Sequence, residues 1–359
     1  MPPGRERVWT TFFLAAEPPL DDIVRAVAHL ARTEKIARIV ALDEFDMETA
    51  ATLREHLRVP GMGLTTMRYF RDKLAMRMKA LERGIRVPDF VPVFNHGDVR
   101  YYLDHVPPPW VLKPRQEASA IGIKKLKEAG AVWPELEQLG DKQSSFLLEQ
   151  FVPGGVYHID SVVSESEVVF ANVSRYGEPP MNVAQGGGVF TSFTVRRNSK
   201  EDDELRRINR ELIGALGLVR GVSHAEFIRA REDGEFYFLE CAARVGGAFI
   251  NEMVEAATGI DLWREWARIE IAGGNGSYKL PTAREEYAGV ILSLARQENP
   301  DTTAYNDPEI CLRIRKHHHA GLLLCSSDAE RIPKLLAAYT RRFEEDFLAV
   351  EPQRDKPTA

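Results

Sequence analysis

The stretch His224–Gly247 constrains the fold of this chain more than any other. Two runs of mixed apolar, aromatic and polar residues flank a short polar turn at 232–234, and its last residue is glycine. Such a pattern predicts a β-hairpin, because glycine readily adopts the positive φ that tight hairpin turns require. If the turn consists of those three residues, Arg231 faces Glu235, and this register fixes every other cross-strand pair.

In that register Glu226 lies directly opposite Glu240. Carboxylates facing each other on adjacent strands repel, since their Cβ atoms are only about 4.5–5.5 Å apart. A divalent cation between them removes the repulsion, and Mg²⁺ prefers carboxylate and phosphate oxygens. The alternative is a pair of unrelated solvated acids on an edge hairpin. A slip of one residue would also break the pair.

The residues after the hairpin favour the metal interpretation. Arg244 follows the second glutamate by four residues, and a guanidinium there can hold an anionic oxygen beside a cation. Gly246 and Gly247 allow a ligand to approach the backbone, and a helical pattern follows at 249–257. Together with the two glutamates, these residues resemble the metal-binding end of the ATP-grasp carboxylate–amine ligases. They are most similar to the L-amino-acid (dipeptide) ligase and carnosine-synthase-like subgroup.

This resemblance implies a set of roles around the hairpin. Glu226 and Glu240 would bind Mg²⁺ or Mn²⁺, and Arg244 would be catalytic. Ala242 stands where the family often has a further asparagine ligand, so the metal would rest on the two glutamates. A glycine-rich loop at 181–191 would help to close the substrate site, and the substrate-binding residues would be Gly187, Gly246 and Gly247. Two further residues, Arg196 and Arg197, follow closely enough to meet an anion.

The resemblance also assigns the nucleotide site. Asp72-Lys73 opens a helix and Trp110-Val-Leu-Lys113-Pro is a short apolar strand that ends in lysine, a suitable charge for phosphates. The stretch 146–155 resembles the ATP-grasp hinge, although Val156 stands where a ribose-binding glutamate is common. The ATP-binding residues implied are Lys73, Lys113, Ser119, Gly122, Glu149, Phe151, Val152, His158 and Leu239.

Composition narrows the class of protein. With 359 residues, 44% hydrophobic and 28% charged, the chain has the make-up of a globular protein of several subdomains. Its net charge of −6 argues against nucleic acid as a main partner, and no apolar run is long enough to cross a membrane. Cys241, Cys311 and Cys325 have no metal-ligand spacing, so we expect three unpaired, buried thiols and a cytoplasmic location.

We expect an α/β fold, with α+β character in the ATP-grasp part. A short N-terminal parallel α/β domain at 1–68 precedes a small ATP-grasp lobe at 69–150. A large lobe with the metal site occupies 151–275, and a small α+β subdomain occupies 276–359.

The N-terminal residues require a choice between two interpretations. Arginines precede the apolar stretch 8–16, which resembles a secretory signal but is short, contains two threonines and runs into Glu-Pro-Pro. We therefore predict a first strand at 8–15, followed by a helix at 21–32, a second strand at 37–42 and a second helix at 48–57. This alternation predicts a small parallel sheet.

The expected activity is ATP-dependent ligation of a carboxylate to an amine through an acylphosphate, with amino acids as substrates. Two alternatives stay open: another ATP-grasp enzyme, a carboxylase or a ligase of other acids, or a nucleotide-binding homologue that has lost catalysis. The sequence does not identify the acid or the amine. A homodimer, the commonest homo-oligomer, is an open alternative to a monomer.

Overall fold

The computed structural model describes residues 11, 18–117, 121–273 and 277–350. The chain divides into two compact units, residues 1–67 and 68–359. In the described residues, no helix combines the length and hydropathy that a membrane crossing requires. The predicted strand at 8–15 lies, except for residue 11, outside the described residues.

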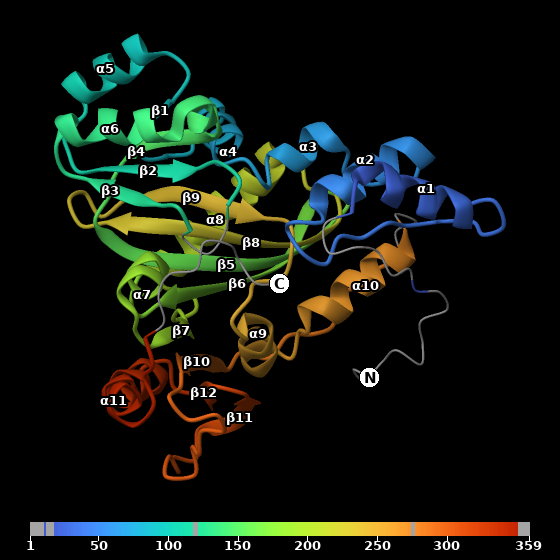
Figure 1. Cartoon of the computed structure of the whole chain (residues 1–359). Coiled ribbons are helices and arrows are strands. Elements are labelled where there is room, and N and C mark those ends of the chain that lie inside the picture. The colour runs from blue at the N-terminus through green and yellow to red at the C-terminus, as the bar shows by residue number, and fades with distance from the viewer. Residues whose placement is uncertain (1–10, 12–17, 118–120, 274–276, 351–359) are drawn as a thin grey trace. The chain divides into compact units, whose positions relative to one another are not determined.

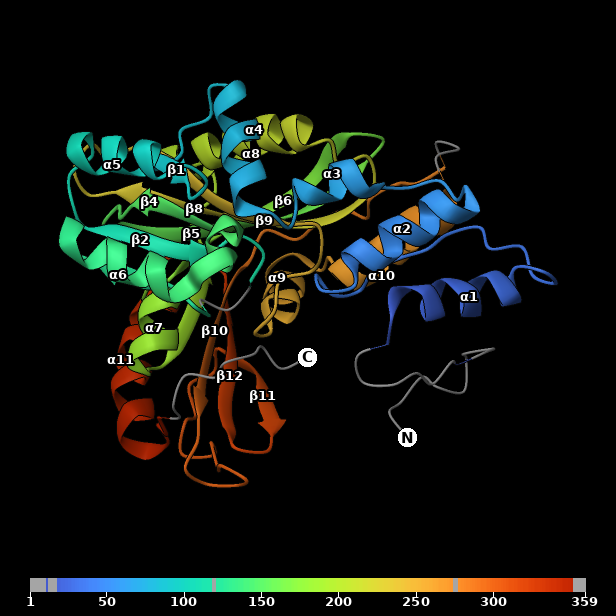
Figure 2. The same ribbon diagram turned by 45° about the horizontal axis from the view of Figure 1, so that its top comes forward.

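The described residues of the N-terminal unit form three helices, and α1 contacts α2 (Figure 2). Their bounds are Leu20–Leu30 for α1, Met47–Leu57 for α2 and Leu64–Arg68 for α3. The segment 37–42, expected to be a strand, forms no ladder with any described residue, and its expected partner at 8–15 lies almost entirely outside the described residues. Arg54 of α2 instead donates two side-chain hydrogen bonds to the Ile39 carbonyl, at 2.9 and 2.6 Å. A side chain therefore satisfies a backbone acceptor that a neighbouring strand would otherwise bind.

The second unit contains a small antiparallel sheet of four described strands, in the order β1-β4-β2-β3. One face packs against helices α5 and α6 through apolar residues that include Trp110, Leu112 and Leu148. Because side chains alternate along a strand, Lys113 and Glu149 belong to the other face. The bounds are Phe90–Pro92 for β1, Trp110–Pro114 for β2, Lys124–Leu126 for β3, Phe146–Gln150 for β4, Lys73–Glu82 for α4, His96–His105 for α5 and Ala129–Leu139 for α6.

A larger antiparallel sheet of eight described strands follows the order β11-β12-β10-β7-β6-β5-β8-β9. Figure 1 shows the small sheet beside its β8–β9 hairpin. The bounds are Gly154–Ser164 for β5, Glu167–Tyr176 for β6, Phe190–Thr194 for β7, Gly221–Ala230 for β8, Phe236–Ala242 for β9, Tyr287–Leu294 for β10, Ile310–Lys316 for β11 and His319–Ser326 for β12. The short β7 joins the two halves, because it pairs with both β6 and β10.

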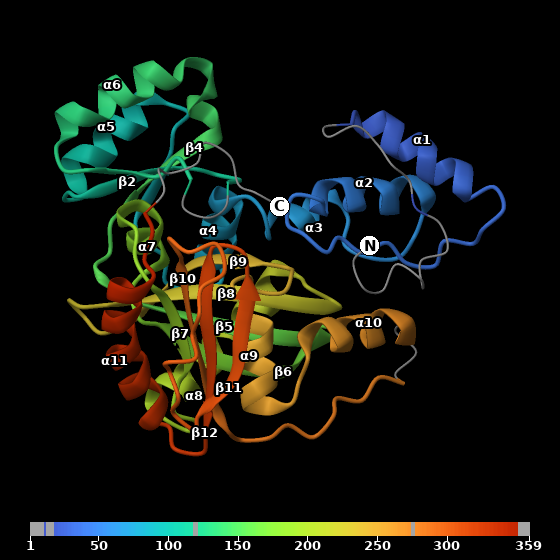
Figure 3. The ribbon, with the colours of Figure 1, turned by 60° about the horizontal axis from the view of Figure 1, so that its bottom comes forward.

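Helices cover both faces of the β10–β12 end of this sheet (Figure 3). Ile291 packs with α11, whereas Ala288 and Val290, of opposite parity on β10, pack with α9. The glycine-rich stretch expected to be a loop begins as the short helix α7. The bounds are Pro180–Gly186 for α7, Lys200–Leu216 for α8, Ile250–Thr258 for α9, Leu262–Ala272 for α10 and Arg331–Asp346 for α11.

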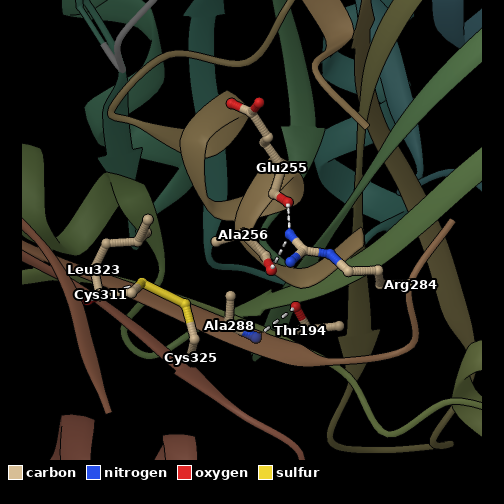
Figure 4. Close-up of a disulfide and its surroundings, with 8 residues drawn as sticks. All are labelled: Thr194, Glu255, Ala256, Arg284, Ala288, Cys311, Leu323 and Cys325. Atoms are coloured by element: carbon tan, nitrogen blue, oxygen red, sulfur yellow. Dashed lines mark hydrogen bonds between the residues drawn. A yellow bond between two sulfur atoms is a disulfide. The ribbon is translucent and has the colours of Figure 1, made fainter. Parts of the chain in front are cut away.

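The cysteines correct one expectation from the sequence. Cys311 and Cys325 form a disulfide between β11 and β12, with Cα atoms 6.1 Å apart (Figure 4). Only Cys241, among the described residues, is the free buried thiol that was expected of all three. The error arises because the register of two antiparallel strands, and not the sequence spacing of 14 residues, brings the pair together.

Candidate active site

The β8–β9 hairpin places Glu226 opposite Glu240, as predicted. The route to this pairing differs from the expected one. Ala230, and not Arg231, pairs with Glu235 at the turn. A β-bulge then adds one residue to β9 and restores the predicted register at the glutamates. Bulges of this kind commonly re-aim side chains next to functional sites.

The two glutamates differ in their partners. Glu240 is held by Lys73, the first residue of α4, whose Nζ lies 3.1 Å from Glu240 Oε2. The phenol of Tyr176 donates to Glu226 Oε1 at 2.8 Å. Burial opposes ionisation of Glu240, but the charges of Lys73 and Lys113 lower its pKa to about 2. Both carboxylates remain partly exposed, so they are open to a ligand. We call Glu226 and Glu240 the carboxylate pair.

A second cluster of charged side chains is buried. Glu149 on β4 accepts hydrogen bonds from Arg77 at 3.0 and 3.2 Å and from the ammonium of Lys113. Arg77 also donates to the carbonyl of Leu239, the extra residue of the bulge. We call Arg77, Lys113 and Glu149 the hinge cluster. Burial lowers the pKa of Lys113 to about 8, although Glu149 acts in the opposite direction.

Arg77 was missed from the sequence. It lies one turn after Lys73 on α4 and is 0% exposed. A basic residue at this spacing on a helix already assigned to the site is a usable signal, because residues four apart share a helix face. Its partner Glu149 is 72 positions away in the chain, so the pair itself was not predictable.

Behind the carboxylate pair lies a buried polar network. Asp160 accepts from His158 Nδ1 at 2.7 Å and from His224 Nδ1 at 2.8 Å. The other ring nitrogen of His158 lies 2.6 Å from Ser192 Oγ, and that of His224 lies 3.3 Å from Tyr176 Oη. The network thus continues through Tyr176 to Glu226. His158 is wholly buried within it.

Burial and nearby charges shift the pKa values of Asp160, His224 and Tyr176 in this network. Burial disfavours a charge on Asp160, but the two histidines outweigh it and hold the pKa of this carboxyl well below its usual range. Burial works against charge on His224 as well, and Asp160 with Glu226 raises its pKa to about 9. Burial and the nearby Glu226 raise the pKa of Tyr176, so its phenol stays protonated and donates to that carboxylate. His158, Asp160 and His224 are also arranged with potential metal-ligand atoms within 4.8 Å of one another.

The glycines after the hairpin occupy different environments. Gly246 packs on the network, because a Cβ there would lie 2.9 Å from His224 Nδ1 and 3.1 Å from Asp160 Oδ1. Gly247 is exposed and a Cβ would meet nothing within 4 Å. Arg244 is partly buried, and its guanidinium donates to the Val245 carbonyl at 2.8 Å.

The remaining predicted residues lie next to strands of the small sheet and at the end of α7. The Phe151 amide donates to Pro109, and the Lys125 ammonium lies 3.3 Å from the centroid of the Phe151 ring. Val152 follows it, partly buried, and Gly122 adopts φ 69°. Gly187 ends α7 with φ 69°, near the side chain of Val350. Ser119 lies outside the described residues.

Comparison with known proteins identifies the domain that carries this geometry. Residues 106–252 match the family described as the ATP-grasp domain. The chain contains an ATP-grasp domain. It is 26% identical over 240 residues to an L-arginine-specific L-amino acid ligase of Bacillus subtilis, covering 65% of this chain and 57% of the relative. It is 24% identical over 187 residues to a D-alanine–D-alanine ligase of Dechloromonas aromatica, covering 52% and 61%. The chain therefore spans less than two thirds of these relatives.

Solved structures agree on the ATP-grasp fold. An L-amino acid ligase from Bacillus licheniformis has a TM-score of 0.71 at 17% identity, covering 93% of this chain and 85% of that one. An N5-carboxyaminoimidazole ribonucleotide synthetase from Thermus thermophilus has a TM-score of 0.69 at 18% identity, covering 92% and 86%.

Ala242, which stands where the family often has an asparagine, has a histidine as its cross-strand neighbour. Ala242 lies directly opposite His224 on the neighbouring strand. The small side chain thus borders an imidazole that already contacts Glu226, with His224 Nε2 3.4 Å from Glu226 Oε1. Val156 is buried in β5, opposite Ile228.

Proposed function

We propose that this chain is an ATP-dependent carboxylate–amine ligase that joins amino acids through an acylphosphate. The observation that carries the proposal is the carboxylate pair, Glu226 opposite Glu240, with the Lys73 ammonium beside it. Relatives named as amino acid ligases and D-alanine–D-alanine ligases support the same chemistry.

The carboxylate pair fits a divalent cation. Tyr176 binds one oxygen of Glu226 and Lys73 contacts one oxygen of Glu240, so the second oxygen of each side chain can act as a ligand. Mg²⁺ is usually bound by one or two carboxylates together with substrate phosphates. When bound, it would neutralise the charge of ATP phosphates beside the pair.

The basic residues supply the complementary charges. Lys73 is 8% and Lys113 6% exposed; Lys73 contacts Glu240, and the charge of Lys113 also lowers the pKa of Glu240. We assign them to the ATP phosphates. The substrate carboxylate would attack the γ-phosphorus of ATP, which forms the acylphosphate and releases ADP. The amine then attacks the acyl carbon and releases phosphate. Arg244 would stabilise the negative oxygen that develops in that step.

The buried network would act by positioning. Tyr176 and His224 both contact Glu226 Oε1, and both are fixed in turn by hydrogen bonds that lead to Asp160. A ligand held in one orientation by outer hydrogen bonds binds a metal with less loss of conformational freedom. Asp160, His158 and His224 are therefore positioning residues in this proposal.

The test is phosphate release from MgATP with a panel of amino-acid pairs, some including L-arginine. We expect release only with particular pairs. Glu240→Gln and Arg244→Gln should each lower the rate by about 10²–10³-fold, the usual effect of removing a group that stabilises transition-state charge. Glu232→Gln changes an exposed residue in the turn of the same hairpin and should behave as wild type.

Two results would contradict the proposal. Release that depends on bicarbonate, and not on an amine, would indicate a carboxylase. Tight MgATP binding with no release in any mixture would indicate a nucleotide-binding protein without ligase activity.

A further inference from the structure

A cleft of about 490 Å³ lies beside the first half of β6. There β6 has β5 on one side but no described strand on the other, because β7 pairs with it only at Ser174–Tyr176. The chain leaves β7 at this point, and Arg197 lines the cleft together with residues of α8 and of the segment 280–285. Apart from Arg197, which the sequence analysis placed close enough to meet an anion, none of the residues assigned above to ATP, metal or substrate is part of its lining.

Arg197 is the most informative residue of this cleft. Its two terminal nitrogens, Nη1 and Nη2, are buried and form no hydrogen bond with any described residue. Its guanidinium carbon lies 4.9 Å from the centroid of the Tyr287 ring, so Tyr287 borders the group. Burial lowers the pKa of Arg197, although Tyr287 acts in the opposite direction. Leaving buried donors unpaired is costly, and more so for charged groups.

Three more arginines line the same cleft. Arg206 is fixed by Asp202 at 2.9 Å and by the Ala171 carbonyl at 2.5 Å. Arg284 is fixed by the carbonyls at the end of α9, Glu255 at 3.1 Å and Ala256 at 3.3 Å (Figure 4). Backbone carbonyls help to hold both guanidinium groups in place without adding a formal negative charge, and Arg206 is paired with the Asp202 carboxylate as well.

The acidic residues of the cleft do not neutralise it. The fourth arginine of the lining, Arg210, is exposed on α8. The lining thus contains four positively charged arginines and two acidic residues, Asp202 and Glu285. Asp202 is already committed to Arg206 and to the Asn198 amide, which it accepts at 3.1 Å. The cleft therefore carries excess positive charge around the unsatisfied Arg197 guanidinium.

We propose that this cleft is a second ligand site, which binds the carboxylate or phosphate group of a small metabolite through Arg197. A planar guanidinium presents two nitrogens side by side, which matches an oxyanion with two oxygens. The volume of the cleft is within the range of small-molecule sites, about 300–1,000 Å³. We therefore expect the ligand to be a small metabolite that carries the carboxylate or phosphate as one of its groups. The site is independent of the ligase proposal, since it uses none of the same residues.

The test is calorimetric titration of the full chain with inorganic phosphate and, separately, with succinate, at constant ionic strength and pH 7. We expect wild type to bind at least one of the two, and Arg197→Gln to bind it at least about 10-fold more weakly, equivalent to about 1.4 kcal/mol. Arg207→Gln is the matched control, because Arg207 lies on α8 outside the cleft and pairs with Glu211 at 2.7 Å. Preference for phosphate or for succinate distinguishes the two kinds of ligand.

Arg210→Gln keeps the test decisive if Arg197→Gln does not fold. Arg210 is exposed at the cleft, so its replacement should leave the fold intact and still weaken binding several-fold. No binding of either anion by wild type at about 20 mM would overturn the proposal, because a site with a Kd of about 1 mM would be nearly saturated at that concentration. So would equal affinities of Arg197→Gln and wild type, since the anion would then be bound elsewhere, for example at the Lys73 and Lys113 side. If only Arg210→Gln folds, an affinity for the anion equal to that of wild type would also overturn the proposal.

Discussion

The hinge cluster and the carboxylate pair place acidic side chains in opposite situations. Glu149 is 4% exposed and its carboxylate is bound by two cationic side chains. Glu240 has one cationic contact, with Lys73, and 40% of its side chain is exposed. Both carboxyls have lowered pKa values, against the effect of burial and because of nearby lysine and arginine charges.

The difference shows how charge can serve structure in one place and binding in another. A buried ion pair with all its partners in place holds elements together, and removing one partner is costly. Here Arg77 ties α4 both to β4 and to the bulge of β9, through Glu149 and the Leu239 carbonyl. The carboxylate pair has spare oxygens and open access, so it can exchange its protein contacts for a cation.

The largest effect should follow from breaking the hinge cluster. Glu149→Ala leaves Arg77 and Lys113 buried without their carboxylate, and should lower the free energy of unfolding by about 3–5 kcal/mol. Urea denaturation measures this change. The control Glu82→Ala removes an exposed ion pair with Lys79 on the same helix α4 and should cost less than about 1 kcal/mol. Equal effects of the two substitutions would mean that the cluster does not stabilise the fold.

The pKa of Lys113 gives the hinge cluster a pH signature. This pKa is lowered in the folded chain, from 10.5 to about 8, so between these values the unfolded chain binds the proton more readily. The free energy of unfolding should therefore rise with pH across that window, by as much as about 3 kcal/mol. Lys113→Gln should remove the rise, whereas Lys79→Gln, which changes an exposed ammonium on α4, should keep it. Parallel pH profiles for wild type and Lys113→Gln would refute the assignment.

The sequence predicted the carboxylate pair better than its surroundings. Period-two alternation and a glycine turn were enough to pair Glu226 with Glu240, although the turn and the bulge contribute compensating shifts of one residue each. A bulge has no sequence signal of its own here. Tyr176 was missed for a different reason, since it reaches Glu226 from a strand 50 positions away in the chain. Such contacts depend on strand order, which local patterns do not encode.

The same limit applies to the buried network and to the N-terminal unit. His158 was expected to contact ATP as a single residue, whereas its ring nitrogens are bonded to Asp160 and Ser192. The segment 37–42 has the composition of a strand but lacks a described partner strand. Strand propensity reports how well a residue suits a pleated, half-buried surface, and it does not supply the partner.

Substitution of Gly246, which follows the hairpin, should have the smallest effect on stability among these predictions. The neighbouring Gly247 provides a closely matched control. Gly246→Ala would place a methyl group 2.9 Å from His224 Nδ1 and 3.1 Å from both Asp160 Oδ1 and Ile250 Cγ2, and should destabilise the fold by about 1–3 kcal/mol. Gly247→Ala meets nothing within 4 Å, so the free energy of unfolding should change by less than about 0.5 kcal/mol. If Gly247→Ala nevertheless raises KM for an amino acid in the phosphate-release assay, the backbone at Gly247 approaches the substrate. If both variants leave stability unchanged, the buried network tolerates displacement, and it then cannot hold Glu226 in one orientation.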